Sequence, residues 1–366
     1  KWVCSRCAAH TILAIEKTMD STPNSSRVRN QTEVSQRDTP AIPGLAPDFL
    51  DHVSVFDPTA GSNEGDILNP TGRISSDKKE SDQPKQTKLL RCTNILKLST
   101  FNVRTLNGPS QLNELVRSMS ENDIDIITLQ EHRIFHPEDK LQYKSNSSFQ
   151  LITSSATKNL GNATVGGVGL LLSPKAFGNL TKVESITSRI MIAEFSSNPV
   201  LTVVCVYSPH NSAPEEEVEE FYSSLRSLLD DIPRHNFLTI AGDFNAKLAR
   251  PDVSFSFNKS TNRNGEHLLD FLEEFDLFSS NNSFTKCANH LWTFQYPSGD
   301  KAQLDYILFR RKWKNSVKDS RAYSSFSSVS SDHRIVSSKV KLSLRKSKQS
   351  KPHPLKKIDW KEASTN

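Results

Sequence analysis

The stretch that decides the fold is NFLTIAGDFNA, residues 236–246, a short apolar run that ends in two polar side chains. A run of this length indicates a buried strand, which delivers a carboxylate, Asp243, and two residues later an amide, Asn245. Because alternate side chains share one face of a strand, we expect both to project the same way. Beside a phosphorus centre the Asp could polarise a water, and the Asn amide could donate to phosphoryl oxygens. The alternative is an ordinary type I turn that uses Asp and Asn as turn formers.

Polar side chains also stand at the ends of other apolar runs. Asn102 ends LKLSTFN, Glu131 ends DIITLQE and Tyr207 ends VVCVY, while Asp332 and His333 precede RIV. In sheets flanked by helices, ligands collect at strand ends, so the recurrence predicts one site built from several loops. Taken singly, each could be a turn residue, a solvated strand end or a packing residue.

Asp305 lies in QLDYIL, a run that is otherwise apolar. A carboxylate there needs a partner or a role, and His333 is the candidate partner. The adjacent pair Asp332 and His333 offers a carboxylate for a metal and an imidazole for proton or phosphate chemistry.

Strand and helix patterns alternate over residues 94–344, which we expect to form one α/β (α+β) folded unit. Helices are expected at 110–123, with Ser110 as N-cap, at 214–232 and at 265–277. The apolar runs that predict strands are 95–101, 123–131, 149–155, 165–173, 189–195, 200–208, 236–246, 303–309 and 333–344.

The chain outside this unit has a different composition. The hydrophobic share of the 366 residues is 35%, which is low for a wholly globular chain. We therefore expect residues 1–90, rich in Ser, Thr, Pro, Asn and Lys, to be disordered. The apolar cluster at 42–56 is either a docking motif or a solvated interruption. Residues 345–366 form a basic tail or linker, and nine Lys or Arg within 339–361 would attract phosphate polymers, or would simply be solvated.

Compartment and cofactor signals are few. No apolar run is long enough to span a membrane, and Arg6 and His10 interrupt what would be the core of a signal peptide. Sparse cysteine in odd number favours a reducing compartment, so nuclear or cytoplasmic localisation is expected. Cys4 and Cys7 form a CxxC, but no second pair follows that would complete a structural zinc site.

The chain carries, in order, STFNVRTL, LQEHR, YSP, GDFNA, WTF, QLDYIL and SDHRIV. This series resembles the endonuclease/exonuclease/phosphatase superfamily over residues 94–344. NRNGEHLLDFLEEFDL followed by WTF and LDYIL is most similar to the apurinic-type endonuclease domain of non-LTR (LINE-type) retrotransposons and to the craniofacial-development-protein genes related to them. The resemblance implies a four-layered αββα sandwich that is DNase I-like.

The resemblance also implies roles for the polar residues. Glu131 would hold Mg²⁺ or Mn²⁺ with help from Asn102, and Asp332 would hold a second metal. Asp243 would orient or deprotonate the attacking water, while Asn245 would bind the phosphate.

The remaining roles concern the phosphate and the groups that support it. Tyr207 would bind the phosphate, and His333, positioned by Asp305, would donate to it as negative charge builds. Thr293 and Ser331 match the supporting hydroxyls of the family motifs.

The function implied is a metal-dependent DNA endonuclease that nicks target sites, from a retrotransposon ORF2-like protein without its reverse transcriptase. DNA is the expected partner, with no membrane and no small-molecule cofactor. The alternatives are a superfamily phosphatase acting on lipid or inositol phosphates, and a domesticated, catalytically silent DNA-binding domain. The loop 247–260 contains Ser and Phe where the family is expected to be rich in Gly and Glu, which leaves substrate contacts there open.

Overall fold

The computed structural model describes residues 88–344 except 107, 137, 139, 325 and 327–329. The expectations for residues 1–87, including the CxxC, and for the tail 345–366 lie outside the described residues. Within the described range no helix is both long and apolar enough to cross a membrane.

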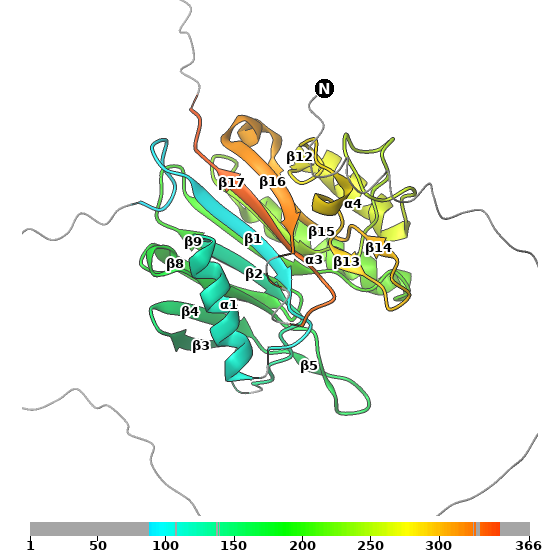
Figure 1. Ribbon diagram of the computed structural model, residues 1–366, viewed down its shortest axis with the longest axis horizontal. Coiled ribbons are helices and arrows are strands. Elements are labelled where there is room, and N and C mark those ends of the chain that lie inside the picture. The colour runs from blue at the N-terminus through cyan, green and yellow to red at the C-terminus, as the bar shows by residue number, and fades with distance from the viewer. Residues whose placement is uncertain are drawn as a thin grey trace, which may run out of the picture. The chain divides into compact units, whose positions relative to one another are not determined.

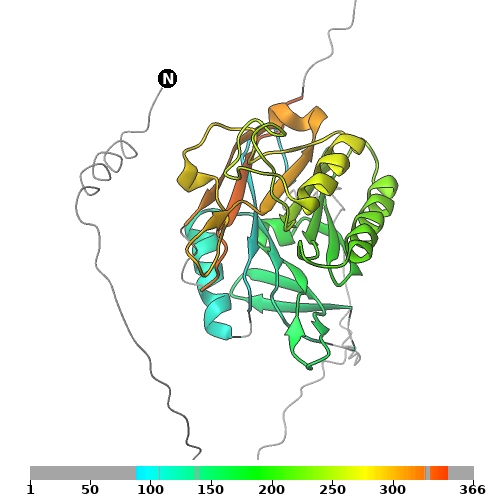
Figure 2. The same cartoon turned by 90° about the vertical axis from the view of Figure 1, so that its right-hand side faces the viewer.

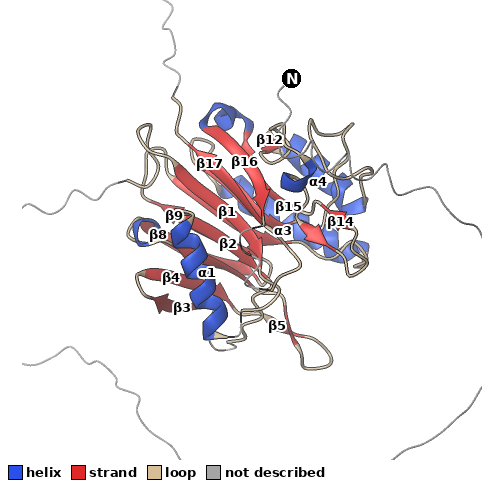
Figure 3. Ribbon diagram, in the orientation of Figure 1, coloured by secondary structure: helices blue, strands red, loops and turns tan. Residues whose placement is uncertain are grey.

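Two mixed sheets dominate the described unit (Figures 1 and 3). The seven-stranded sheet has the order β16 (Val317–Tyr323), β17 (Ile335–Val340), β1 (Leu96–Asn102), β2 (Ile126–Gln130), β7 (Val168–Leu172), β4 (Phe149–Ser154), β3 (Leu141–Asn146). The six-stranded sheet has the order β12 (Leu277–Ser279), β15 (Asp305–Arg310), β11 (Phe237–Asp243), β10 (Leu201–Tyr207), β9 (Ile190–Phe195), β8 (Leu180–Thr187). Two short hairpins pair β5 (Thr157–Lys158) with β6 (Thr164–Val165), and β13 (Phe294–Gln295) with β14 (Lys301–Ala302).

The helices cover the outer faces of both sheets. The helical segments are α1 (Pro109–Glu121), α2 (Pro174–Phe177), α3 (Glu215–Asp231), α4 (Arg263–Glu274) and the 3₁₀ turns η1 (Ala288–His290) and η2 (Arg311–Ser316). Figure 2 shows α1 on one side of the sheets and α3 with α4 on the other. The layers are therefore helix, sheet, sheet and helix, which is the predicted αββα sandwich.

Alternation along the strands explains these layers. In β11, Phe237 and Ala241 enter the core between the sheets, whereas Leu238 and Ile240 pack against the layer of α3 and α4. Every side chain of β11 is buried. A strand buried on both faces reads as a continuous apolar run, which is how FLTIAG reads in the sequence.

The strands that the sequence did not reveal lie at sheet edges. β3, β8 and β16 are edge strands, and many of their side chains are exposed or only partly buried. Because an edge strand pairs on one side only, more of its side chains face solvent and can be polar. The alternation of apolar residues that would predict a strand is therefore weak. The expected helix 265–277 was too long at its end for a related reason, because the chain turns at Asp276 (φ +50°) and enters β12.

The expected N-cap of the first helix was wrong. Gly108, not Ser110, occupies the N-cap position, and Pro109 is the first helical residue. Proline has no N–H to leave unsatisfied in the first turn, so it favours this position. The Gly108 N–H donates to Gln111 Oε1 at 3.2 Å, which closes the helix start.

Candidate active site

Strand parity brings four predicted polar residues to one end of the sandwich. Tyr207 ends β10, Asp243 ends β11 and Asp305 begins β15. Each lies two residues from a side chain of the same strand that packs in the core between the sheets, and therefore points to the same side. Those core side chains are Cys205, Ala241 and Ile307. Tyr207 pairs with Asp243, and Asp243 with Asp305, at the last rungs of these ladders. Across the sandwich, Asn102 likewise ends β1. The side chains therefore converge at the mouth between the two sheets.

Glu131 follows β2 and is held by three donors. Asn102 Nδ2 and Tyr207 OH each donate to Oε1 at 2.9 Å, and Arg133 donates to Oε2 at 2.9 Å. Burial acts to raise the pKa of Glu131, but these donors and the Arg133 charge outweigh it and lower the pKa. The side chain is thus an anion that faces the cleft, with about a fifth of its surface exposed.

Asp243 is buried and joined to the same network. Asn102 Nδ2 donates to Asp243 Oδ2 at 3.0 Å, so one amide ties the two carboxylates together across the sheets. The backbone N–H of Asn245 donates to Asp243 Oδ1 at 2.9 Å. Burial, and then the charge of Asp305, raise the pKa of Asp243 above its usual value. A carboxylate with a raised pKa accepts a proton readily near neutral pH.

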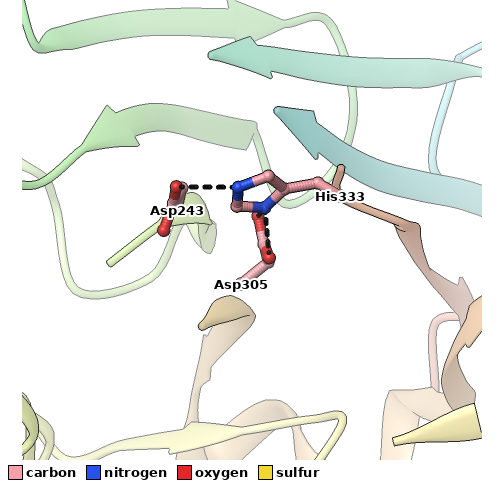
Figure 4. A group of neighbouring side chains, drawn as sticks. All are labelled: Asp243, Asp305 and His333. Atoms are coloured by element: carbon pink, nitrogen blue, oxygen red, sulfur yellow. Dashed lines mark hydrogen bonds and ion pairs between the residues drawn. The ribbon is translucent and has the colours of Figure 1, made fainter. Parts of the chain in front are cut away.

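Asp243, Asp305 and His333 form a compact group in which the imidazole lies between two carboxylates (Figure 4). His333 Nδ1 lies 3.0 Å from Asp305 Oδ2, and Nε2 lies 3.8 Å from Asp243 Oδ2. Burial acts to lower the pKa of His333, but Asp305 and Asp243 together raise it to about 9. The imidazole is therefore protonated at neutral pH and can donate from both nitrogens.

Ser331 and Thr293 hold the backbone around this group. Ser331 Oγ donates to the carbonyl of Asn102 at 2.6 Å and accepts the His333 N–H at 3.0 Å, which links the loop before β17 to the end of β1. Thr293 Oγ1 accepts the N–H groups of Leu304 and Asp305 at 2.9 and 3.2 Å. Both hydroxyls position site backbone, and neither is among the residues that line the cleft.

Asn245 differs from the expected strand geometry. β11 ends at Asp243, and Asn245 adopts a left-handed backbone with φ +49°. Its side-chain Nδ2 donates to the carbonyl of Ser208 at 3.0 Å. The period-two expectation therefore fails beyond Asp243, although Asp243 and Asn245 still line the same cleft.

The glycine of GDFN is required by close packing. A Cβ on Gly242 would lie 1.9 Å from the carbonyl oxygen of Val206 in the neighbouring strand. Real Cβ atoms do not approach backbone oxygen so closely, so only glycine lets β10 and β11 pair here and bring Tyr207 beside Asp243.

The cleft itself has a volume of about 490 Å³. Its lining side chains combine the carboxylates of Glu131, Asp243 and Asp332 with cations. The lining is completed by Arg104, Arg133, Tyr207, His210, Asn211, Ser212, Asn245, Lys247, Asn262, Phe294, Tyr296, Leu304 and His333. Asp332 is a third exposed, and Arg104 lies 3.8 Å from it.

Several residues that line the cleft were missed in the sequence, among them two arginines and two aromatic residues, Phe294 and Tyr296. Arg104 and Arg133 both have positive φ, +58° and +57°, and no periodic pattern reveals such turns. The Phe294 ring packs at a tilt against the His333 ring, with centroids 4.7 Å apart. The signal for Phe294 was present, because it belongs to the WTF motif, and Arg133 belongs to LQEHR.

The donor set suits a hard divalent cation. Glu131 offers carboxylate oxygens held anionic, and Asp332 offers a second partly exposed carboxylate in the same cleft; oxygen ligands of this kind suit Mg²⁺. Asn102 Oδ1 accepts the Arg104 N–H at 2.9 Å, so Asn102 supports such an ion by orienting Glu131. His333 has both nitrogens directed at carboxylates, which makes it a donor rather than a ligand.

Comparisons with known proteins place the chain in a family. The family described as Endonuclease/Exonuclease/phosphatase family matches residues 99–333. Craniofacial development protein 2 from Bos taurus and from Tragulus javanicus are each 28% identical over 266 residues, 71% of this chain. The match covers 43% and 45% of those proteins, so the chain spans less than half of their length.

Solved structures with a similar fold have low sequence identity. The endonuclease domain of TRAS1, a telomere-specific non-LTR retrotransposon, has a TM-score of 0.50 and 16% identity, and covers 68% of this chain and 99% of that one. The 3′ phosphatase NExo from Neisseria, bound to product DNA hairpin, has a TM-score of 0.51 and 19% identity, and the match covers 67% of this chain and 99% of that one. The AP endonuclease LMAP from Leishmania major has a TM-score of 0.53 and 14% identity, and the match covers 68% of this chain and 88% of that one.

These structures share the fold of the described unit, and the family match extends over more than half of the chain. The resemblance inferred from the ordered motifs is thereby confirmed. The chain belongs to the endonuclease/exonuclease/phosphatase family.

Proposed function

We propose that this domain is a Mg²⁺- or Mn²⁺-dependent DNA endonuclease of the non-LTR retrotransposon type. The observation that carries the proposal is the position of His333 between Asp305 and Asp243, with Asn102 joining Asp243 to Glu131 at the mouth of the sandwich. This arrangement places a proton acceptor, a cationic donor and an anionic metal ligand around one cleft.

Each group has one task in phosphodiester hydrolysis. Asp243 accepts the proton of a water as the water oxygen bonds to phosphorus, and its raised pKa suits this role. The bond from phosphorus to the leaving DNA oxygen breaks in the same displacement, and that oxygen takes a proton from solvent. His333 donates from Nε2 to a phosphoryl oxygen as negative charge builds, and Asp305 keeps the ring oriented and charged. Tyr207 and Asn245 would bind the phosphate from the cleft wall.

Glu131 would hold the divalent ion, and Asp332 would hold a second one. When bound, the ion neutralises charge on the phosphate and helps to orient it. The Tyr207 hydroxyl donates to Glu131, and burial raises its pKa, so it acts as a neutral donor.

DNA is the substrate class that the cleft favours. Arg104, Arg133 and Lys247 line it, and cations of this kind contact nucleic-acid phosphates. The proteins of similar fold also include endonucleases and a phosphatase bound to DNA. Nothing in the cleft favours a lipid or inositol phosphate over DNA.

The test compares substrates on the same protein. With Mg²⁺ we expect the full chain to nick supercoiled plasmid and to release no phosphate from inositol phosphates. Asp243→Asn should lower the nicking rate by about 10³-fold while DNA affinity changes little, because the lost interaction acts in the transition state. Faster release of inorganic phosphate than nicking would favour the phosphatase alternative. DNA binding without any nicking would favour the silent DNA-binding domain.

A further inference from the structure

A second groove, of about 500 Å³, lies beside the candidate active site. We call it the basic groove, because its lining contains five cationic side chains and no acidic one: Lys247, Arg250, Lys259, Lys286 and Lys301. Lys247 also lines the catalytic cleft, so the two depressions share a wall. No role has yet been given to the basic groove.

Most of its positive charge has no counterion in the protein. Lys286 Nζ pairs with Asp319 Oδ1 at 2.5 Å. The other four cations, taken within residues 88–344 as described, form no ion pair. The ammonium groups of Lys247 and Lys301 lie over aromatic rings, 5.4 Å from the Tyr296 centroid and 4.5 Å from the Trp292 centroid. A concave surface lined by one sign of charge concentrates ligands of the other sign.

The segment that presents three of these cations is braced from within. Asn258 Nδ2 donates to the Gln303 carbonyl at 2.9 Å, and the Gln303 N–H donates back to Asn258 Oδ1 at 3.0 Å. Lys247 N–H donates to Asn262 Oδ1 at 2.7 Å, and Ala249 bridges Asn258. A loop whose backbone is fixed in this way loses little backbone freedom on binding, so the attachment points of the cations are preorganised for a ligand.

A polymer of phosphates fits this surface better than a membrane does. Binding to a lipid surface usually adds large exposed apolar side chains to the charge. The large exposed apolar side chains of the described residues are Ile95, Phe135, Tyr143, Leu160, Phe177 and Leu344, none of which lines the basic groove. The groove also shares Lys247 with a cleft suited to a phosphodiester.

We propose that the basic groove binds the phosphodiester backbone of the DNA strand that continues beyond the cleaved bond. This inference rests on the proposed function, because it takes the DNA in the cleft as its starting point. Backbone contacts of this kind set the register of the nucleic acid without reading its sequence. The groove therefore positions DNA. Arg250 and Lys259 carry this role, since both are exposed and neither lines the catalytic cleft.

The test is the salt dependence of binding, measured on the full chain. The probe is a labelled duplex of about 30 base pairs, with EDTA present to suppress cleavage, titrated at several KCl concentrations. Each phosphate contact contributes about 0.9 to the slope of log affinity against log salt, so Arg250→Ala with Lys259→Ala should reduce the slope by about 2. A single-stranded probe should show a reduction of about 1.4, because one backbone occupies the groove.

The matched control removes two exposed lysines elsewhere. The control variant combines Lys140→Ala, just before β3, with Lys144→Ala, within β3. Figure 1 shows β3 well apart from β14, the strand that carries Lys301 of the groove. An equal slope for the groove variant and this control would overturn the proposal, as would a change seen with duplex alone. Thermal melting checks that both variants fold. Because binding is read without cleavage, an absence of nicking would count against the proposed function and leave this result standing.

Discussion

His333 has both ring nitrogens directed at buried carboxylates, Asp305 and Asp243. The two anions raise the pKa of His333 to about 9 against the opposing effect of burial. The imidazolium therefore persists through neutral pH and is lost only as the pH rises through that value. If activity needs this cation, the nicking rate should fall at high pH as His333 loses its proton. We call this fall the alkaline limb of the pH–rate profile.

Removal of Asp305 should move that limb. In Asp305→Asn the favourable charge is gone while burial remains, so the pKa of His333 falls and activity is lost at lower pH. We expect rate losses of about 10²-fold for Asp305→Asn and about 10³-fold for His333→Ala. The double variant should lose no more than the larger single loss, since the two act as a unit. Plasmid-nicking rates across pH measure both effects.

An independent contribution of the two residues would give multiplicative losses instead. If Asp305 serves only the fold, Asp305→Asn would lower the melting temperature without displacing the alkaline limb.

The site shows which residues a sequence can supply. Asn102, Glu131, Tyr207 and Asp243 were predicted because each stands at the end of an apolar run, where a loop begins. Asp305 was predicted because it is a carboxylate within an otherwise apolar run. Arg104, Arg133 and the left-handed turn at Asn245 were not, because their positions depend on positive φ angles that leave no pattern in the sequence. The catalytic roles of the predicted residues stay predictions.

At the scale of elements, the connection after β2 is locked onto β7 by one buried histidine. His132 Nδ1 accepts the Ile134 N–H at 3.0 Å, and Nε2 donates to the Val168 carbonyl at 3.2 Å. A Cβ on Gly167, whose φ is +88°, would meet the ring at 2.5 Å. Burial lowers the pKa of His132 to about 4, so the ring is neutral in the folded protein.

This histidine makes the fold sensitive to acid. The unfolded chain binds a proton near pH 6.5 and the folded chain only near pH 4. Stability from the neutral ring is therefore complete above about pH 6.5 and is lost as the pH falls toward 4, by on the order of 3 kcal/mol. His132→Gln should lose less stability than the wild type between about pH 7 and pH 5 in urea unfolding.

His235 provides the control, because it is exposed. His235→Gln should leave the acid sensitivity of the wild type unchanged. Parallel pH profiles for the wild type and His132→Gln would show that another group causes the loss.

Elements buried on both faces were predicted well, and edge elements were not. β2, β10 and β11 are nearly or fully buried, so composition alone marks them. β3 and β8 present mostly exposed or partly buried side chains. Within the described residues each pairs only with the strand that follows it in the chain, β4 or β9, but its polar side chains give no apolar pattern that would mark a strand.

At the scale of the whole described unit, the candidate site belongs to both sheets. Asn102 and Glu131 come from the seven-stranded sheet, and Tyr207, Asp243 and Asp305 from the six-stranded one. A polar layer beneath them crosses between the sheets, where Thr128 Oγ1 donates to the Ala241 carbonyl at 3.3 Å. The packing of the sheets therefore sets the distances of the site, which no single strand pattern could predict.

The central claim is that this mouth between the sheets hydrolyses DNA phosphodiesters with a divalent ion held by Glu131. Its most direct test is nicking of supercoiled plasmid by the full chain with Mg²⁺ and with EDTA, beside Glu131→Gln as the matched variant. We expect nicked circles with Mg²⁺, none in EDTA, and a loss of at least about 10²-fold in Glu131→Gln. Nicking that continues undiminished in EDTA, or at the wild-type rate in Glu131→Gln, would contradict it.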